Sequence, residues 1–423
     1  MSLIGSLFRG SYARKCARGI FLVLLTVLVI ATPLAGCFGA RDLGERLDKV
    51  LVAVIADMVG PNAPFTIAAV HGFEDAVRYV NERGGVHRVQ VEVMVKDTGS
   101  KAGLAILRFD EVVAQEPGPV LLFSPVPGLF ETFEDRVAQE KVVTLALPWQ
   151  GVAGTPEYGF AVYPGYPEMF GAFIDWLKED WKGQGRPKVA FVTTDDIQGR
   201  AVLAPESYEY ARSRGVDVVG TEVYSPHQVN VDTELARVRA AGADWIFTNA
   251  VGNGSYRLFE GLKNLGYRIP VAGSLGLDWS ILRAWGKDMV EGVVAVLPSV
   301  SWDEEEQLKG LSAMRKQIFD RSSRNVATDM TPMYPIGVAA AMVGLEAVAR
   351  AVATTGWQGL NGEAIRAEML KLKDFSPLGL AYFTFTSEHH TPSKVRIYRF
   401  QQGKLLPVGD WRDVPDMRAA ASK

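Results

Sequence analysis

Short apolar runs typical of buried strands alternate along most of the chain with segments that have helical apolar spacing. Residues 50–56 form the first apolar run. In residues 66–81 the apolar positions Val70, Phe73 and Val77 then recur every three or four residues, which predicts one buried face of a helix. Strands that alternate with helices in this way indicate a parallel β-sheet with helical crossovers.

The same alternation continues to residue 297, with one interruption around residues 163–167, and three helical segments then follow one another to residue 371. Further strands are predicted at 89–95, 120–123, 142–145, 188–193, 216–224, 244–248, from 271, and at 292–297; further helices are predicted at 101–114, 129–139, 168–181, 200–214, 231–241, 255–265, 304–321, 333–353 and 362–371. In residues 381–407 apolar and polar positions alternate as in a β-strand, which predicts a closing antiparallel hairpin. Two successive α/β sets predict two similar lobes.

The N-terminus has the order of an export signal. Four basic residues between positions 9 and 18 precede the apolar residues 20–31, a run that fits a signal peptide but is too short to cross a bilayer. Leu34-Ala35-Gly36-Cys37 follows and resembles the bacterial lipobox, in which the cysteine is lipidated and the bond before it is cut. The alternative is an uncleaved anchor with an incidental cysteine.

Cleavage before Cys37 would remove Cys16, so the mature protein would contain one acylated cysteine and no disulfide. Two or more acyl chains would hold it stably at a membrane. The length of 423 residues exceeds one typical domain. The formal net charge of -3, without a basic tract, argues against a nucleic-acid partner.

Several short motifs, in their order along the chain, resemble the type I periplasmic binding proteins, specifically the leucine/isoleucine/valine-binding family. They are Gly60-Pro61, Asn81-Glu82-Arg83-Gly84-Gly85-Val86, Lys96-Asp97-Thr98, Asp195-Asp196-Ile197-Gln198-Gly199-Arg200, Ala240-Ala241-Gly242-Ala243-Asp244 and Glu291-Gly292-Val293. The resemblance covers about residues 49–410. It implies an α/β fold of two Rossmann-like lobes joined by three hinge strands.

The resemblance also implies a division of the chain. Residues 1–36 are expected to be a lipoprotein signal peptide and 37–48 a tether; residues 49–163 with 299–377 form the first lobe, 164–298 with 378–410 the second, and 411–423 a C-terminal tail. The three hinge crossings are expected near residues 163–164, 298–299 and 377–378.

Motifs that would indicate an enzyme or a cofactor site are incomplete. Residues 252–257 half-match a dinucleotide fingerprint, but Arg257 takes the place of its last glycine. Residues 272–276 miss the first glycine of a nucleophile elbow around Ser274. A turn at the cleft edge is the simpler interpretation of residues 252–257. The sequence therefore predicts a protein that is not an enzyme and needs no cofactor.

The titratable residues give no metal site either. The five histidines lack His-Glu-x-x-His spacing, and the chain has no cysteine cluster. The pair His389-His390 is expected in a solvated loop. The acidic residues 303–306 are expected at the solvent-exposed start of a helix, where they complement its dipole.

The resemblance places the ligand between the lobes, at the carboxyl ends of the strands. In the first lobe, the loop 124–128 is expected to present backbone N–H groups and a helix N-terminus to a carboxylate or amide oxygen. Trp149 and Gln150 lie where the family lines its cleft, although Trp149 also fits a half-buried core position. The expected ligand-binding residues are Ser124, Val126, Pro127, Gly128, Trp149, Gln150, Gln198, Val251, Asn253 and Leu275.

This sequence departs from the family at the positions that bind an amino acid. Gln198 and Val251 replace two tyrosines, and Leu275 lies near the place of the acidic partner of the ligand ammonium. Val251 and Leu275 cannot pair with a buried ammonium group. The expected ligand is therefore not a standard free α-amino acid, unless Asp196 or Asp278 replaces the missing acid.

The function that the resemblance implies is capture of a small organic solute for an ABC importer. The protein would be a monomeric lipoprotein on the extracytoplasmic side of a membrane, delivering its solute to a membrane permease. A ligand sensor of the same fold that acts on a membrane kinase or chemoreceptor is the alternative.

Overall fold

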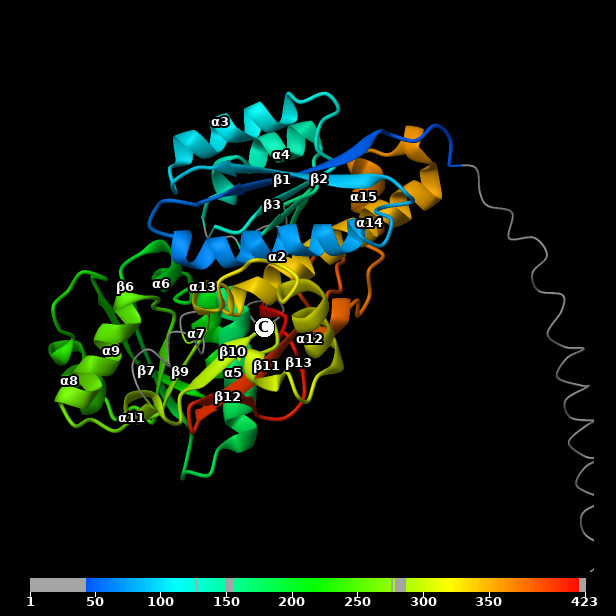
Figure 1. The fold of residues 1–423 in the computed structure, drawn as a ribbon. Coiled ribbons are helices and arrows are strands. Elements are labelled where there is room, and N and C mark those ends of the chain that lie inside the picture. The colour runs from blue at the N-terminus through cyan, green and yellow to red at the C-terminus, as the bar shows by residue number, and fades with distance from the viewer. Residues whose placement is uncertain (1–42, 127, 149–155, 275–276, 278–286, 418–423) are drawn as a thin grey trace, which may run out of the picture. The chain divides into compact units, whose positions relative to one another are not determined.

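The computed structural model describes residues 43–126, 128–148, 156–274, 277 and 287–417. Residues 1–44 and 45–423 form two separate units, and the description below concerns the second unit. Within that unit the described chain forms two lobes, each built on its own β-sheet (Figure 1).

The first lobe contains five parallel strands in the order β2-β1-β3-β4-β5. Their bounds are β1 (Lys49–Ala56), β2 (Gln90–Asp97), β3 (Leu121–Ser124), β4 (Thr144–Ala146) and β5 (Gly159–Ala161). The helices α2 (Ala63–Asn81) and α14 (Met333–Thr355) cover one face, and α3 (Ala102–Val113) and α4 (Glu134–Glu140) the other (Figure 1). The short α15 (Gly362–Met369) packs on α14.

The sheet of the second lobe has the order β12-β11-β10-β9-β8-β6-β7, and β13 pairs with β11. Its strands are β6 (Lys188–Thr194), β7 (Asp217–Tyr224), β8 (Trp245–Thr248), β9 (Val271–Gly273), β10 (Val294–Leu297), β11 (Lys394–Gln401), β12 (Lys404–Pro407) and β13 (Arg412–Asp413). Strands β6 to β10 are mutually parallel, whereas β11 runs antiparallel to β10 and β12.

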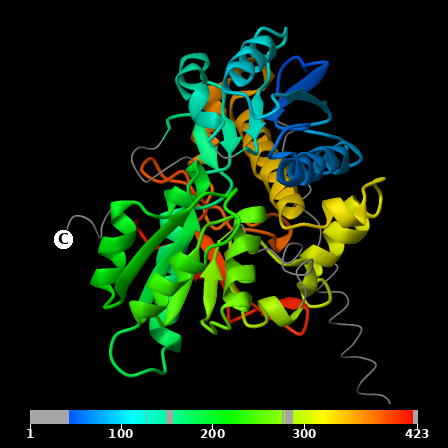
Figure 2. The same ribbon diagram turned by 90° about the vertical axis from the view of Figure 1, so that its left-hand side faces the viewer.

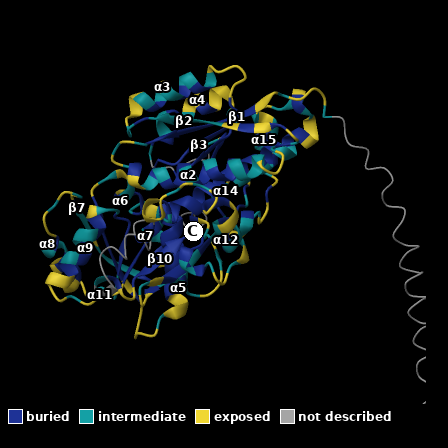
Figure 3. Ribbon diagram, viewed as in Figure 1, coloured by how far each residue is buried: buried dark blue, intermediate teal, exposed yellow. Residues whose placement is uncertain are grey.

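Helices also cover both faces of the second sheet. The helices α5 (Tyr166–Asp180) and α7 (Pro205–Ser213) lie together on one face, and α8 (Asp232–Ala240) and α9 (Asn253–Asn264) on the other (Figure 2). Phe170 of α5 packs its ring against Phe191 and Phe247 of the sheet. Buried residues are concentrated in the sheets and on the helix faces that cover them (Figure 3).

The chain passes between the lobes three times. It leaves the first sheet after β5 and enters the second lobe at α5, returns after β10 to form α14, and leaves α14 and α15 to form β11. The second lobe extends beyond residue 410, because β13 pairs with β11 and Met417 is buried near Gly171 of α5.

Helix α14 is long and apolar enough to span a membrane by length and composition. However, 72% of its most apolar window is buried inside the protein. Gly344 of α14 lies against Leu121 and Leu145 of the first sheet. Its apolar character is therefore explained by its position in the core of the first lobe.

Two predicted helices are shorter than expected. The predicted helix 200–214 divides into α6 (Ile197–Ala201) and α7, because Pro205 begins a new helix where its missing N–H costs nothing. The predicted helix 304–321 begins only at α12 (Lys309–Met314) and ends in a π-helical turn at Arg315–Phe319.

The predicted hairpin is also shorter, and it is limited to β11 and β12. Phe383 contributes only an isolated bridge to Phe375.

His390 is buried, which contradicts the prediction of a solvated loop. Its ring stacks on Phe160 with 4.2 Å between centroids, and its Nδ1 lies 2.8 Å from the carbonyl oxygen of Gly159 and 2.9 Å from that of Pro156. The backbone carbonyl of His390 also accepts a hydrogen bond from Ala161. The imidazole thus closes a turn against β5, a role that the local sequence did not reveal.

The stability of the protein should fall when the pH is lowered through the ordinary pKa of histidine. Burial lowers the pKa of His390 below 6.5, although its two hydrogen bonds to carbonyl oxygens oppose the shift. As the pH falls, His390 takes up a proton in the unfolded chain before it does so in the folded protein. The contribution of His390 to the free energy of unfolding is therefore constant above about pH 6.5 and decreases below it. Urea unfolding at a series of pH values measures this decrease. His390→Asn, which keeps a donor but does not titrate, should reduce the slope; an unchanged slope would contradict the assignment.

Candidate functional site

The carboxyl ends of the parallel strands form the functional edge of each sheet. In the first lobe, Asp57 directly follows β1, and its buried carboxylate accepts hydrogen bonds from the backbone N–H groups of Gly60 and Asn62 and from the Ser100 hydroxyl. Burial alone would raise the pKa of Asp57, but the hydrogen bonds outweigh it and lower the pKa. A Cβ atom on Gly60 would lie 2.7 Å from this carboxylate, so glycine allows the loop its tight turn.

The loop after β3 carries three of the predicted ligand-binding residues that the structure describes. Ser124 is 1% exposed, and its Oγ has no hydrogen-bond partner within the described part of the chain. Val126 is buried. Gly128 has φ +74°, and a Cβ atom there would lie 3.6 Å from Cγ2 of Ile197 in the other lobe. The loops after β3 and β6 therefore approach each other across the lobes.

In the described part of this loop, the helix N-terminus that was expected to seat an anion is not formed directly after residue 128. A 3-10 turn, Phe130–Thr132, follows the loop, and α4 begins only at Glu134 and has seven residues. The N–H group of Leu129 already donates to the carbonyl oxygen of Val126. Helix α4 is short, and the acidic residues of its first turn would repel an anion. Its N-terminus therefore cannot supply the favourable dipole that the prediction required.

In the second lobe, Asn249 lies at the centre of a chain of hydrogen bonds that includes Gln198. The backbone carbonyl of Gln198 accepts from Nδ2 of Asn249 at 2.5 Å, and Oδ1 of Asn249 accepts from the Ser274 hydroxyl. Nε2 of Gln198 is buried and has no hydrogen-bond partner among the described residues. These bonds link the segments that follow β6, β8 and β9 and leave the side-chain amide donor of Gln198 unused.

Asp196 precedes Gln198 and caps α6. Its Oδ1 accepts a hydrogen bond of 2.7 Å from the backbone N–H of Gly199. The remaining predicted residues of this lobe lie at the rim: Val251 is half-buried, and Asn253 is exposed with its Nδ2 3.2 Å from the carbonyl oxygen of Pro226.

Tyr166 and Glu131 were not predicted to bind ligand. Tyr166 begins α5 directly after the first crossing; it is 3% exposed, and its hydroxyl has no hydrogen-bond partner in the described ranges. Burial raises the pKa of Tyr166, and the charges of Glu131 and Asp196 raise it further.

Five predicted residues lie outside the described residues. They are Pro127, Trp149, Gln150, Leu275 and the lipidation site Cys37. The structure therefore brings together Ser124, Gly128 and Gln198 of the predicted set, and it places Asn253 at the rim.

The histidine, cysteine and acidic residues of the described chain form no group of three or more that could hold a metal ion. Ser274 donates to an amide oxygen rather than to a histidine. An amide oxygen cannot act as the general base of a serine nucleophile.

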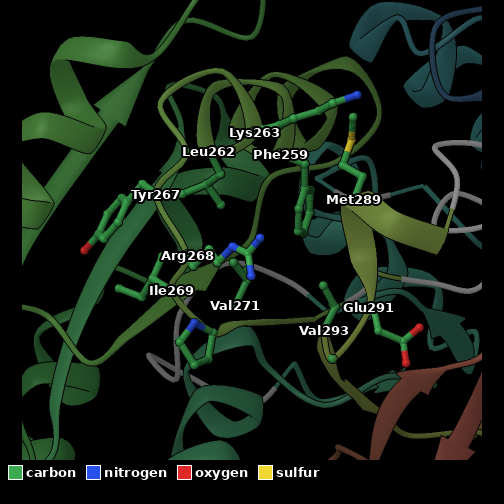
Figure 4. A pocket seen from close by; sticks show the side chains of 13 residues that line it. Phe259, Leu262, Lys263, Tyr267, Arg268, Ile269, Val271, Met289, Glu291 and Val293 are labelled. Carbon is green, nitrogen blue, oxygen red and sulfur yellow. The ribbon is translucent and has the colours of Figure 1, made fainter.

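A separate pocket of about 910 Å³ lies at the opposite end of the second sheet (Figure 4). Val271, the first residue of β9, and Val293, just before β10, line it together with Phe259 of α9 and Met289 of α11 (Lys287–Val290). Because these are the amino ends of the strands, this pocket is distinct from the edge that carries Gln198 and Asn249.

A family model described as "Periplasmic binding protein" matches residues 49–404. A branched-chain amino acid ABC transporter protein from Thermus thermophilus with bound valine has a similar structure, with a TM-score of 0.78, 20% identity, and coverage of 90% of this chain and 100% of that chain. A fatty acid ABC transporter substrate-binding protein from Thermomonospora curvata gives a TM-score of 0.71 and 17% identity over 89% of this chain and 95% of that chain.

An extracellular ligand-binding receptor from Rhodopseudomonas palustris HaA2 gives a TM-score of 0.68 at 18% identity, over 85% of this chain and 100% of that chain. The search of curated proteins found no match. At these identities the solved structures show the fold, and they confirm the predicted α/β architecture of two lobes. The family match extends over most of the chain and confirms the resemblance, so the protein belongs to the periplasmic binding protein family.

Proposed function

We propose that the protein is the extracytoplasmic, lipid-anchored solute-binding component of an ABC importer. It captures a small organic solute, either an amino acid or a related carboxylate or amide, when its two lobes close. The observation that carries this proposal is a set of buried polar groups that have no hydrogen-bond partner among the described residues: the Ser124 hydroxyl at the end of β3, the Tyr166 hydroxyl at the start of α5, and Nε2 of Gln198 after β6. Buried polar groups are normally hydrogen-bonded, and a bound solute would supply the missing partners.

Closure follows from contacts that only the closed form can make. A ligand that touches both lobes favours the closed state by its differential affinity alone. Roughly 5.5 kcal/mol of such differential binding shifts the closed population from 1% to 99%. A few hydrogen bonds to a charged ligand group, each contributing roughly 1.5–3 kcal/mol, are sufficient. A membrane permease then recognises the closed lobes.

The lipid anchor rests on Leu34-Ala35-Gly36-Cys37 after a basic and apolar leader. An acylated Cys37 would hold the monomeric binding protein at the membrane that carries its permease. The Ser274 hydroxyl donates to the amide oxygen of Asn249, a partner that fits a structural role better than hydrolysis.

A thermal-shift screen of small solutes tests the proposal, because a ligand that binds only the folded state raises the melting temperature. At a free concentration of 100 times its dissociation constant, a solute raises the free energy of unfolding by about 2.7 kcal/mol. We expect at least one amino-acid-related solute to do so and to be recovered unchanged. Stabilisation by none of them, or their turnover, would contradict the proposal.

Leucine, isoleucine and valine should not bind with micromolar affinity. Val251 cannot pair with an ammonium group, and Leu275 takes the position of the family's acid, so the usual seat for an α-amino acid is missing. Isothermal titration calorimetry with each of the three measures this directly. Micromolar binding of any of them would show that the family's binding mode is retained.

A further inference from the structure

The pocket at the amino ends of β9 and β10 is lined by two turns that lead from a helix into a strand. The chain turns from α9 into β9 through residues 265–270, and from α11 into β10 through residues 291–293. Each turn contains a glycine in the left-handed region, Gly266 with φ +56° and Gly292 with φ +85°. The pocket volume of about 910 Å³ lies within the range of roughly 300–1,000 Å³ that is typical of small-molecule sites.

Apolar side chains from two helices and two strand ends line this pocket. Phe259 of α9, Val271 and Val293 are at most 4% exposed. Met289 of α11 is half-buried and belongs to the same lining. An apolar group of a ligand that covered these side chains would leave water, which is favourable. The lining therefore suits the apolar part of a small molecule.

A cationic side chain without a partner lies among these apolar groups. Figure 4 shows the guanidinium of Arg268 near the middle of the pocket. Arg268 makes no hydrogen bond or ion pair with the residues that the structure describes. Glu291 also lines the pocket, but its carboxylate points away from Arg268 and accepts hydrogen bonds of 3.1 and 3.2 Å from the backbone N–H of Gln402. The guanidinium is therefore available to an anion from outside the protein.

We propose that this pocket is a second binding site, separate from the solute cleft, for a small monocarboxylate with a compact apolar body. A guanidinium pairs with a carboxylate through two parallel N–H···O bonds, which an ammonium group cannot offer. The carboxylate would bind Arg268, and the apolar body would cover Phe259, Val271 and Met289. Because the pocket lies at the opposite end of the sheet from Gln198, the site does not depend on the proposed solute function.

Three probes that share one ring system and differ in charge test the ligand class. They are 2-naphthoate, its neutral amide 2-naphthamide, and (2-naphthyl)methylammonium. In calorimetry on the mature chain, we expect 2-naphthoate to bind about tenfold more tightly than the amide, because only the carboxylate pairs with a guanidinium. The ammonium should bind more weakly than both, since Arg268 repels it. Absence of naphthoate binding, or binding of either other probe as tightly as naphthoate, would overturn the inference.

Methionine methyl groups locate the bound probe. Met289 lines the pocket, whereas Met58 follows β1 at the carboxyl edge of the first sheet. In a chain with carbon-13-labelled methionine methyl groups, 2-naphthoate should shift the nuclear magnetic resonance signal of Met289, which Met289→Leu assigns, and leave that of Met58 in place. A naphthoate complex in which the Met289 signal does not move would overturn the inference, because the probe would then lie elsewhere.

Charge variants of Arg268 test the anchor itself. Arg268→Gln should weaken the binding of 2-naphthoate about tenfold and leave that of 2-naphthamide unchanged. Arg268→Glu should reverse the preference, so that the ammonium probe binds more tightly than naphthoate; misfolding cannot produce this gain.

Arg212→Gln is the matched control. Arg212 is an exposed arginine of α7, on the other face of the same sheet, and it has no side-chain partner in the described ranges. Its substitution should leave all three affinities unchanged. Equal losses of naphthoate binding in Arg268→Gln and Arg212→Gln would overturn the inference, as would an Arg268→Glu protein that still prefers the carboxylate. Failure of the solute screen with these results intact would refute the proposed function alone.

Discussion

Asp75→Ala is expected to lower the free energy of unfolding by about 3–5 kcal/mol, since it removes the buried carboxylate that pairs with Arg324 and Tyr334. The Asp75 carboxylate, 4% exposed, accepts two hydrogen bonds from Arg324, at 2.9 and 3.1 Å, and one of 2.8 Å from the Tyr334 hydroxyl. This cluster joins α2 to the start of α14. Its loss leaves Arg324 with Glu74 as its remaining acidic partner and removes the acceptor of the buried Tyr334 hydroxyl.

The neighbouring Glu74 provides the matched control. It accepts a 3.0 Å hydrogen bond from the same arginine, but its side chain is 34% exposed. Glu74→Ala should therefore cost no more than about 1 kcal/mol. Urea unfolding of both variants measures the difference. Similar costs for both substitutions would mean that the buried cluster contributes no more than a surface ion pair.

Gly337→Ala should destabilise the first lobe by about 1–3 kcal/mol or more, because it forces two helices apart. A Cβ atom on Gly337 of α14 would overlap the carbonyl oxygen of Ala69 in α2, and one on Gly72 would overlap the carbonyl oxygen of Tyr334. The two helices thus cross through a pair of glycines at backbone contact.

Gly103→Ala in α3 is the control, since nothing lies within 4 Å of its Cβ position. This variant should gain about 0.4–1 kcal/mol because alanine restricts the unfolded chain. The double variant Gly72→Ala/Gly337→Ala should cost less than the sum of the two single changes, because the first substitution already separates the helices. A stable Gly337→Ala protein would contradict the close crossing.

The order of strands and helices could be predicted because each buried strand and amphipathic helix has its own local pattern. Prediction failed where a local signal was weak or misread. The three-residue β5 is too short to show a periodicity, and Pro205 was not read as the start of α7. His390 was assigned to solvent because its polar neighbours suggested a loop, whereas it is tertiary contact with Phe160 that buries it.

The candidate site was predictable only in part, for a related reason. Ser124 and Gln198 follow strands, so topology alone places them at the functional edges. Glu131 and Tyr166 lie 35 residues apart and on different lobes, and no local pattern relates them. Tyr166 begins α5 directly after the crossing that follows β5, and it is buried by packing that only the folded chain defines.

The distance between the two lobe rims, with and without a bound solute, tests the central claim most directly. Val59, which follows β1, is 80% exposed, and Val229, which follows β7, is 77% exposed. Spin labels at these positions, in a mature chain without other cysteines, report the separation of the rims by pulsed electron paramagnetic resonance. Closure around a solute predicts a shorter and narrower distance distribution at saturation. An unchanged distribution with solute bound would contradict it.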